Sequence, residues 1–208
     1  MFTSVRVILL KRALWICTLA LGCFGALPSR AAYDLFLKFY AEDGTPIVGE
    51  SLDKSYPGSD GWIYLPGFNF GISNAVTIGS SSGGAGAGKA VFNDITLTKS
   101  VDSMSPILFK YASTGSHFKS ARLVVRQVGS RDGLGHLQYE FNTVFVTSVN
   151  WAGNTGDDSV GESIVLKAGA MLIRYEKQNP NGTFAKPSVA SWSVILNSSA
   201  FDPLPDGP

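Results

Sequence analysis

The sequence predicts a mainly β domain, a closed or sandwiched antiparallel β-barrel with one short α-helix. Apolar and polar residues alternate in several separate runs, which is the period of a half-buried strand. Beyond the N-terminal region, only residues 105–114 have the 3.6-residue period of a helix. Gly, Pro, Asp and Ser gather between the runs, as they do in turns between strands. These three observations favour a barrel that carries a single helix.

The chain begins with a segment typical of a secretory signal peptide. Basic residues precede an apolar run over 13–27, and small residues surround Ala31. We expect cleavage after Ala31 or Ala32, so that residues 1–31 are the signal peptide. Two alternatives stay open. One is lipid attachment at Cys23, and the other is an uncleaved N-terminal anchor, for which the apolar run is short.

Loss of this leader changes the composition that bears on function. Both cysteines lie within it, so the mature chain would have no disulfide and no cysteine nucleophile or metal site. The remainder carries 13 basic and 16 acidic residues, a net charge of −3, which argues against a nucleic-acid-binding surface. Residues 32–198 suffice for one domain with its own core, and we expect a disordered tail over 199–208.

The alternating runs predict the strands in order along the chain. Residues 33–40 alternate strictly, and residues 41–61, rich in Gly, Asp, Pro and Ser, are expected to form a long loop. An aromatic strand over 62–72 is expected to break near Pro66. Further strands are predicted at 91–98, 122–126, 137–149, 163–175 and 192–196. In the longest run, one face is expected to hold Leu137, Tyr139, Phe141 and Phe145.

The helix has start and stop signals as well as a period. Its expected apolar face consists of Met104, Ile107, Leu108, Tyr111 and Ala112. Ser105 is expected as the N-cap and Pro106 as the first helical residue, where its missing N–H is not needed. Gly115 follows the last periodic residue and suits a left-handed C-terminal cap.

No pattern in the chain predicts catalysis, so we expect no enzyme, cofactor or metal. Gly83–Lys89 has the spacing of a phosphate-binding loop, but Ala90 replaces the required Ser or Thr and a strand follows. Gly79–Gly83 matches G-x-S-x-G without the strand–turn–helix context of a nucleophile. The two histidines, His117 and His136, share no metal-ligand spacing.

Short motifs follow one another in a fixed order between residues 87 and 126. Their members are Gly88, Lys89, Phe92 and Asp94, then Thr98, Lys99 and Asp102, then Ser105 and Pro106, and finally Gly115, His117 and Arg126. In order and spacing they resemble the hemolysin-coregulated protein (Hcp) family, the tube protein of bacterial type VI secretion. Segments at 33–38, 49–51 and 146–149 extend the resemblance, which covers about residues 33–197.

The resemblance implies a β-barrel with one helix, six copies of which form a ring. Such rings would stack into a tube, and their lumen would shelter small effector proteins. The implied partners are further copies of the chain, effectors and other type VI secretion components, without stable membrane insertion after cleavage. We expect ring or stacking contacts in the loop over 41–61, in the loop over 79–89 and on the outward face of 62–72. The residues expected there include Asp43, Glu50, Ser51, Trp62 and Tyr64.

The N-terminal leader departs from the family pattern, because family tube proteins assemble in the cytoplasm and lack a cleavable signal. An alternative hypothesis is therefore an exported binding module that acts in the periplasm or outside without a contractile machine. A third hypothesis, an enzyme on the same scaffold, has no site that meets the sequence criteria.

Overall fold

The computed structural model describes residues 33–77, 86–128, 137–181 and 183–207. The chain divides into two compact units, Met1–Ala31 and Ala32–Pro208, and the described residues all belong to the second. The predicted signal peptide, with Ala31 and Ala32, lies outside the described residues. None of the helices in the described part of the chain is long and apolar enough to cross a membrane.

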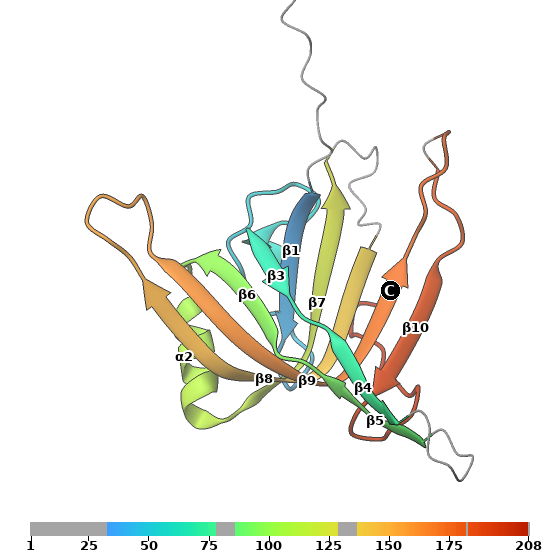
Figure 1. Cartoon of the computed structure of the whole chain (residues 1–208). Coiled ribbons are helices and arrows are strands. Elements are labelled where there is room, and N and C mark those ends of the chain that lie inside the picture. The colour runs from blue at the N-terminus through green and yellow to red at the C-terminus, as the bar shows by residue number, and fades with distance from the viewer. Residues whose placement is uncertain (1–32, 78–85, 129–136, 182, 208) are drawn as a thin grey trace, which may run out of the picture. The chain divides into compact units, whose positions relative to one another are not determined.

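The second unit is built on one curved antiparallel sheet of eight strands (Figure 1). Along the sheet the strands follow the order β2, β1, β7, β8, β9, β6 and β3, with β10 also paired to β9. They are β1 (Tyr33–Tyr40), β2 (Trp62–Leu65), β3 (Gly67–Asn69), β6 (Ile95–Ser100), β7 (His117–Gln127), β8 (Leu137–Ala152), β9 (Gly161–Tyr175) and β10 (Ser188–Ser193). A short 3-10 turn, η2 (Gly58–Asp60), precedes β2. The prediction of a mainly β barrel with one helix is confirmed.

The sheet is nearly closed because one run of chain reaches both of its edges. β2 pairs with β1, placing Leu65 opposite Leu35, while β3 pairs with β6, placing Gly67 opposite Thr98. Pro66 lies between the two strands and lacks the N–H that a continuous strand would use in its ladder. The predicted break near Pro66 is therefore the point at which the chain crosses the seam of the barrel.

The core lies on the concave side of the sheet and continues under the helix α2 (Ser105–Thr114). In β1, Leu37 and Phe39 point into this core, while Phe36, Lys38 and Tyr40 lie on the other face of the strand. Met104 and Leu108 of the helical face are fully buried in the same cluster, and burying a side chain of this size contributes about 1.5–3 kcal/mol. Tyr111 stacks on Phe118 with ring centroids 4.0 Å apart. The predicted apolar face is thus the face that packs.

The helix ends as expected but begins differently. Gly115 adopts φ 68° and donates its N–H to the carbonyl of Tyr111, which is a left-handed cap. Ser105 is not the N-cap as we predicted, because it is already helical and the residue before it has no side-chain cap. Asp102 takes the capping role instead, since its Oδ1 accepts the N–H of Met104 at 2.9 Å.

Three further strand predictions need correction. The strand expected over 91–98 is interrupted, because β5 (Gly86–Phe92) ends before β6 begins and belongs to a separate two-stranded sheet. Phe145 does not share a face with Phe141, because Thr143 adopts φ 55° and reverses the alternation, so that Val144 is buried and Phe145 is exposed. The last strand occupies Ser188–Ser193 rather than 192–196. A positive φ at a Thr has no sequence signal, since β-branched residues rarely adopt it.

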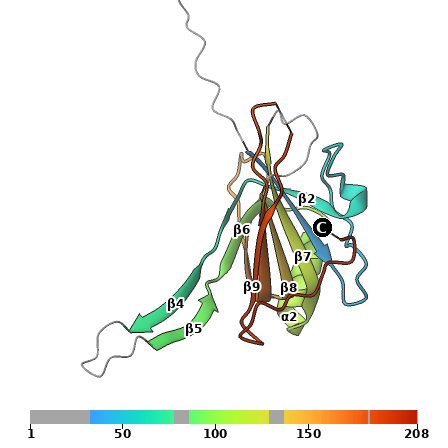
Figure 2. The same ribbon diagram turned by 90° about the vertical axis from the view of Figure 1, so that its right-hand side faces the viewer.

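A separate two-stranded arm projects from the barrel (Figure 2). It consists of β4 (Ile72–Thr77) and β5 (Gly86–Phe92), which pair with each other. The register shifts at Ala75, and a Cβ added at Gly88 would collide with the Ala75 carbonyl oxygen. Gly88 is therefore needed for close backbone approach. Residues 79–85 of the expected contact loop lie outside the described residues, while 86–89 belong to the arm.

The C-terminal segment packs on the barrel, which differs from the disordered tail that we expected. After β10, the chain turns through a bridge between Ser193 and Ser198. It then crosses the outer face of the sheet and ends near β1 (Figure 2). Leu204 is only 4% exposed, and the charged residue near the end, Asp206, forms ion pairs with the sheet. Residues 199–207 are thus a strap over the barrel.

Candidate functional site

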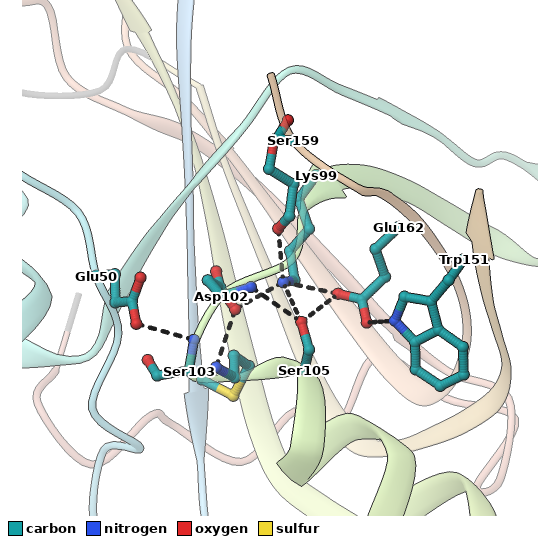
Figure 3. Close-up of polar contacts among 10 residues, drawn as sticks. Glu50, Lys99, Asp102, Ser103, Ser105, Trp151, Ser159 and Glu162 are labelled. Carbon is teal, nitrogen blue, oxygen red and sulfur yellow. Dashed lines mark hydrogen bonds and ion pairs between the residues drawn. The ribbon is translucent and has the colours of Figure 1, made fainter. Parts of the chain in front are cut away.

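The motif residues Lys99, Asp102 and Ser105 meet at the N-terminus of α2, together with Glu162 of β9 (Figure 3). The ammonium of Lys99 lies 2.6 Å from Asp102 Oδ1, 2.7 Å from Glu162 Oε2 and 2.9 Å from Ser105 Oγ. The side chains of Lys99 and Glu162 are 1% and 0% exposed. We call these four residues the inner cluster.

Neighbouring groups complete the hydrogen bonding of the inner cluster. Trp151 donates its Nε1–H to Glu162 Oε1 at 2.7 Å, and the Ser105 hydroxyl donates to Glu162 Oε2 at 2.9 Å. Glu50, from the segment at 49–51, accepts a hydrogen bond from the backbone N–H of Ser103 at 2.9 Å (Figure 3). Three stretches that are distant in sequence therefore converge on the first turn of one helix.

The inner cluster carries two carboxylates and one ammonium, a formal excess of one negative charge. It lies where the unpaired N–H groups of the helix create a positive field, which favours that excess. Lys99 shares its three protons among four oxygens, including the Ser100 carbonyl at 3.0 Å. Because the buried groups already bind one another, the cluster fixes the helix on the sheet rather than presenting a group for chemistry.

Arg126, the last motif residue, joins β7 to β1 and to the loop over 41–61. It lies 2.6 Å from both Asp34 Oδ2 and Asp53 Oδ2, and its guanidinium stacks over the Phe36 ring at 4.9 Å. The hydrogen bond from Arg126 holds the pKa of Asp53 below its ordinary value, against the opposing effect of burial. The same pairing raises the pKa of Arg126. These residues border a cavity of about 400 Å³ that Tyr64 also lines.

A second buried charge network lies on the outer face of the sheet. Strand register places Lys38, Arg122 and Glu140 in one row across β1, β7 and β8. Arg122 Nη2 lies 3.0 Å from Glu140 Oε1. Asp206 of the strap lies 2.9 Å from Lys38 Nζ and 3.2 Å from Arg122 Nη1. We call Lys38, Arg122, Glu140 and Asp206 the outer cluster.

The pKa values of the two carboxyl groups in the outer cluster shift in opposite directions. Burial raises the pKa of Glu140, and the nearby Arg122 offsets this only in part. Burial would also raise the pKa of Asp206, but hydrogen bonds from Tyr40 and Lys38 outweigh it and lower the value. The Tyr40 hydroxyl donates to Asp206 Oδ2 at 2.6 Å, and burial together with this bond raises the pKa of Tyr40.

The residues expected on a contact surface are only partly available. Trp62 is 7% exposed and packs edge-on against Tyr56, with ring centroids 4.9 Å apart, and Ser51 is also buried. These two expectations are wrong for the isolated chain, because the loop over 41–61 folds back on β2. Tyr64 is 52% exposed. Asp43 is exposed but accepts hydrogen bonds from Thr45.

The other motif residues have local structural roles. Asp94 forms an exposed ion pair with Lys167 at 3.3 Å, and the Thr98 hydroxyl donates to the Gly67 carbonyl. His117 Nε2 lies 2.8 Å from Glu42 Oε1. Lys89 is exposed on the arm and Phe92 is half-buried at its end. The described ranges contain no group of three or more His, Cys, Asp or Glu side chains that could hold a metal ion.

Sequence reasoning missed Glu162 and the outer cluster. Glu162 closely follows Asp157 and Asp158, a sequence typical of an exposed acidic turn, yet it shares its strand face with Ile164 and Leu166, which are core residues. This alternation could have indicated that the Glu162 side chain faces the core. The outer cluster had none, because it depends on the register of three strands and on a tail that looked disordered.

Known proteins with a similar sequence or fold agree with this arrangement. A family model described as "Type VI secretion system effector, Hcp" matches residues 36–177. Protein hcp1 of Pseudomonas aeruginosa is 28% identical over 113 residues, which span 54% of this chain and 70% of that protein.

Solved structures are similar over most of the second unit. The structure of a type six secretion system protein has a TM-score of 0.70 at 28% identity, covering 80% of this chain and 99% of that one. Hcp1 from Salmonella typhimurium has a TM-score of 0.63 at 26% identity, covering 81% and 99%. A type VI secretion system effector from Yersinia pestis has a TM-score of 0.59 at 26% identity, covering 77% and 99%. The chain therefore belongs to the Hcp family of type VI secretion system effectors.

Proposed function

We propose that this chain is a secreted structural protein that assembles into rings of six copies. The rings stack into a tube, whose lumen carries effector proteins. Membership of the Hcp family supports this proposal. The inner cluster also supports it, because each of its buried charged groups is paired with an oppositely charged group.

The arm is the single observation that carries the proposal. In the described part of the chain, β4 and β5 pair only with each other, and an isolated two-stranded hairpin is marginal in water. Ile72 and Val91 on this arm are 53% and 56% exposed. A second copy that covers these apolar side chains would stabilise the arm, so we assign the arm to contact between subunits.

The loop over 41–61 supplies the second contact in this proposal. Leu52 is 99% exposed at the edge of the cavity beside Arg126, and Val48 and Tyr64 are also exposed. Exposed apolar side chains around a concave site are typical of protein contacts. The contact residues that we propose are therefore Val48, Leu52 and Tyr64, rather than the buried Trp62 and Ser51.

An arm variant tests the assembly. Ile72→Asp with Val91→Asp places two charges on the arm without touching the barrel core. We expect a loss of assembly by light scattering and an unchanged free energy of unfolding of the subunit. Val101→Asp with Val160→Asp, at two similarly exposed residues away from the arm, is the matched control. Rings that persist in the arm variant would contradict the role of the arm.

The leader favours a second candidate, an exported binding module that acts without a contractile machine. Its basic and apolar segments end just before the compact unit that begins at Ala32. We propose residues 1–31 as a signal peptide cleaved at Ala31 or Ala32, with Cys23 lipidation as the alternative. N-terminal sequencing of protein from fractionated cells tests this. An intact Met1 on cytoplasmic protein would contradict export through the leader.

A further inference from the structure

The strap lies outside the part of the chain that the family model matches, since that match ends at residue 177. It follows a single row of outward side chains across the sheet. The register joins Lys38 to Arg122, Arg122 to Glu140, Glu140 to Leu172 and Leu172 to Ser191. The strap makes contact at both ends of this row, because Ser191 donates to the Ser199 carbonyl at 2.7 Å and Lys38 pairs with Asp206.

The charges of this row require one anion from elsewhere. Lys38 and Arg122 are buried against a single carboxylate of the sheet, Glu140. Without Asp206, the row would hold one uncompensated cation in a place largely removed from water, which is costly. Asp206 brings the formal charge to zero, and its carboxylate is bound by an ammonium, a guanidinium and the Tyr40 hydroxyl.

Apolar and backbone contacts add to this carboxylate recognition. Leu204 is buried and lines the same cavity as Glu140 and Leu172. Asn142 donates to the Asp202 carbonyl at 2.9 Å, and Arg122 donates to the Gly207 carbonyl. A cavity of about 380 Å³ remains between the strap and the strands β8, β9 and β10. The strap is therefore held at a few anchor points rather than packed along its whole length.

We propose that the outer face of the barrel contains a binding site for an acidic peptide. The site consists of Lys38, Tyr40 and Arg122, together with the apolar surface of the barrel against which Leu204 is buried. Within one chain its ligand is the strap, residues 199–207. In an assembly of several copies, the same segment of a second copy occupies it in exchange. This site does not rest on ring formation, because a single chain contains all of its parts.

A peptide with the sequence of residues 198–208, labelled at its N-terminus, tests the site by fluorescence anisotropy. The receptor is the full chain with Leu204→Ser and Asp206→Asn, which weakens its own strap and leaves the site intact. We expect saturable binding to this receptor and at least about tenfold weaker apparent binding to the wild type, whose strap competes at high effective concentration. A peptide with Asn at position 206 is expected to bind the receptor about fivefold more weakly, because the Asp206 carboxylate is partly exposed.

Two additional receptors keep the test decisive. The full chain with Asp206→Asn alone, whose folding is checked by its unfolding transition, should rank the two peptides in the same order. Adding Lys38→Met to that chain should reduce the preference for the acidic peptide, since only Arg122 and Tyr40 then remain to bind its carboxylate. Equal binding of both peptides, or no binding by either weakened receptor, would overturn the proposal. Because the assay scores monomers and rings alike, failure of ring assembly would leave its outcome unchanged.

Discussion

The inner and outer clusters use the same chemistry with different consequences. Each pairs buried cations with carboxylates from distant parts of the chain. In the inner cluster both carboxylates belong to the region that matches the family, and Glu162 is fully buried. In the outer cluster the closing carboxylate, Asp206, comes from the added C-terminal segment and is 38% exposed. One cluster is closed by residues of the barrel and its helix, whereas the other is closed by a carboxylate of the C-terminal strap.

This difference separates two uses of a buried ion pair. Opening the inner cluster would require the helix to leave the sheet, because Asp102 and Ser105 lie at its first turn. Opening the outer cluster requires only the last residues of the chain to move. The inner cluster therefore specifies the fold, and the outer cluster is suited to exchange of a ligand.

The largest expected effect comes from removing Glu162. Glu162→Ala leaves Lys99 buried with one carboxylate and deprives the Trp151 N–H of its acceptor. Lys99 keeps Asp102 as a partner, so the cost comes mainly from the donors of Trp151 and Ser105, which lose their acceptor. A buried donor left without an acceptor costs about 1–3 kcal/mol, which denaturant unfolding would measure. Glu162→Gln keeps an acceptor for Trp151 and should cost less. A loss of under about 1 kcal/mol for Glu162→Ala, the range of a surface pair, would contradict a sealed cluster.

A smaller effect is expected from opening the outer cluster. Asp206→Asn removes the charge that pairs with Lys38 and Arg122. Because Asp206 is partly exposed, screening limits the loss to about 1 kcal/mol. Asp202→Asn, the same change in the same strap, is the matched control, since Asp202 is exposed and accepts a hydrogen bond from Asn142 through its backbone carbonyl. Equal losses of unfolding free energy in the two variants would contradict a specific role for the Asp206 carboxylate.

The smallest effect is a dependence on pH. The pKa of Asp206 lies below its ordinary value of 3.8 in the folded chain. Its stabilisation is therefore fully present above the ordinary value and is lost as the pH falls through the lowered one. The raised pKa of Glu140 acts in the opposite direction, since protonation of Glu140 favours the folded state.

Unfolding of the wild type and of Asp206→Asn at a series of pH values measures the contribution of the Asp206 charge, including its effect on the pKa of Glu140. The difference in unfolding free energy should be constant above about pH 5 and should shrink toward zero in stronger acid. A difference that stays the same down to about pH 2 would contradict the assignment of the shift to Asp206.

Local sequence patterns predicted local structure, but the pairing register of strands that are distant in sequence could not be predicted. The strand at 33–40 and the helix at 105–114 were predicted because a simple period and cap residues define them. The face on which Phe145 lies was predicted wrongly, because a positive φ at Thr143 reverses the alternation of the strand. The strap was missed because Pro, Gly and Asp look like a disordered end, and only the sheet below it supplies the partners of Asp206.

The central claim is that this Hcp-family barrel is a ring-forming structural protein. Light scattering of a chain beginning at Ala32, with negative-stain images of the same peak, tests it most directly. We predict a mass of six subunits and six-fold rings with an open centre. A stable monomer at all accessible concentrations would contradict the claim and would mean that this chain keeps the family fold without its assembly.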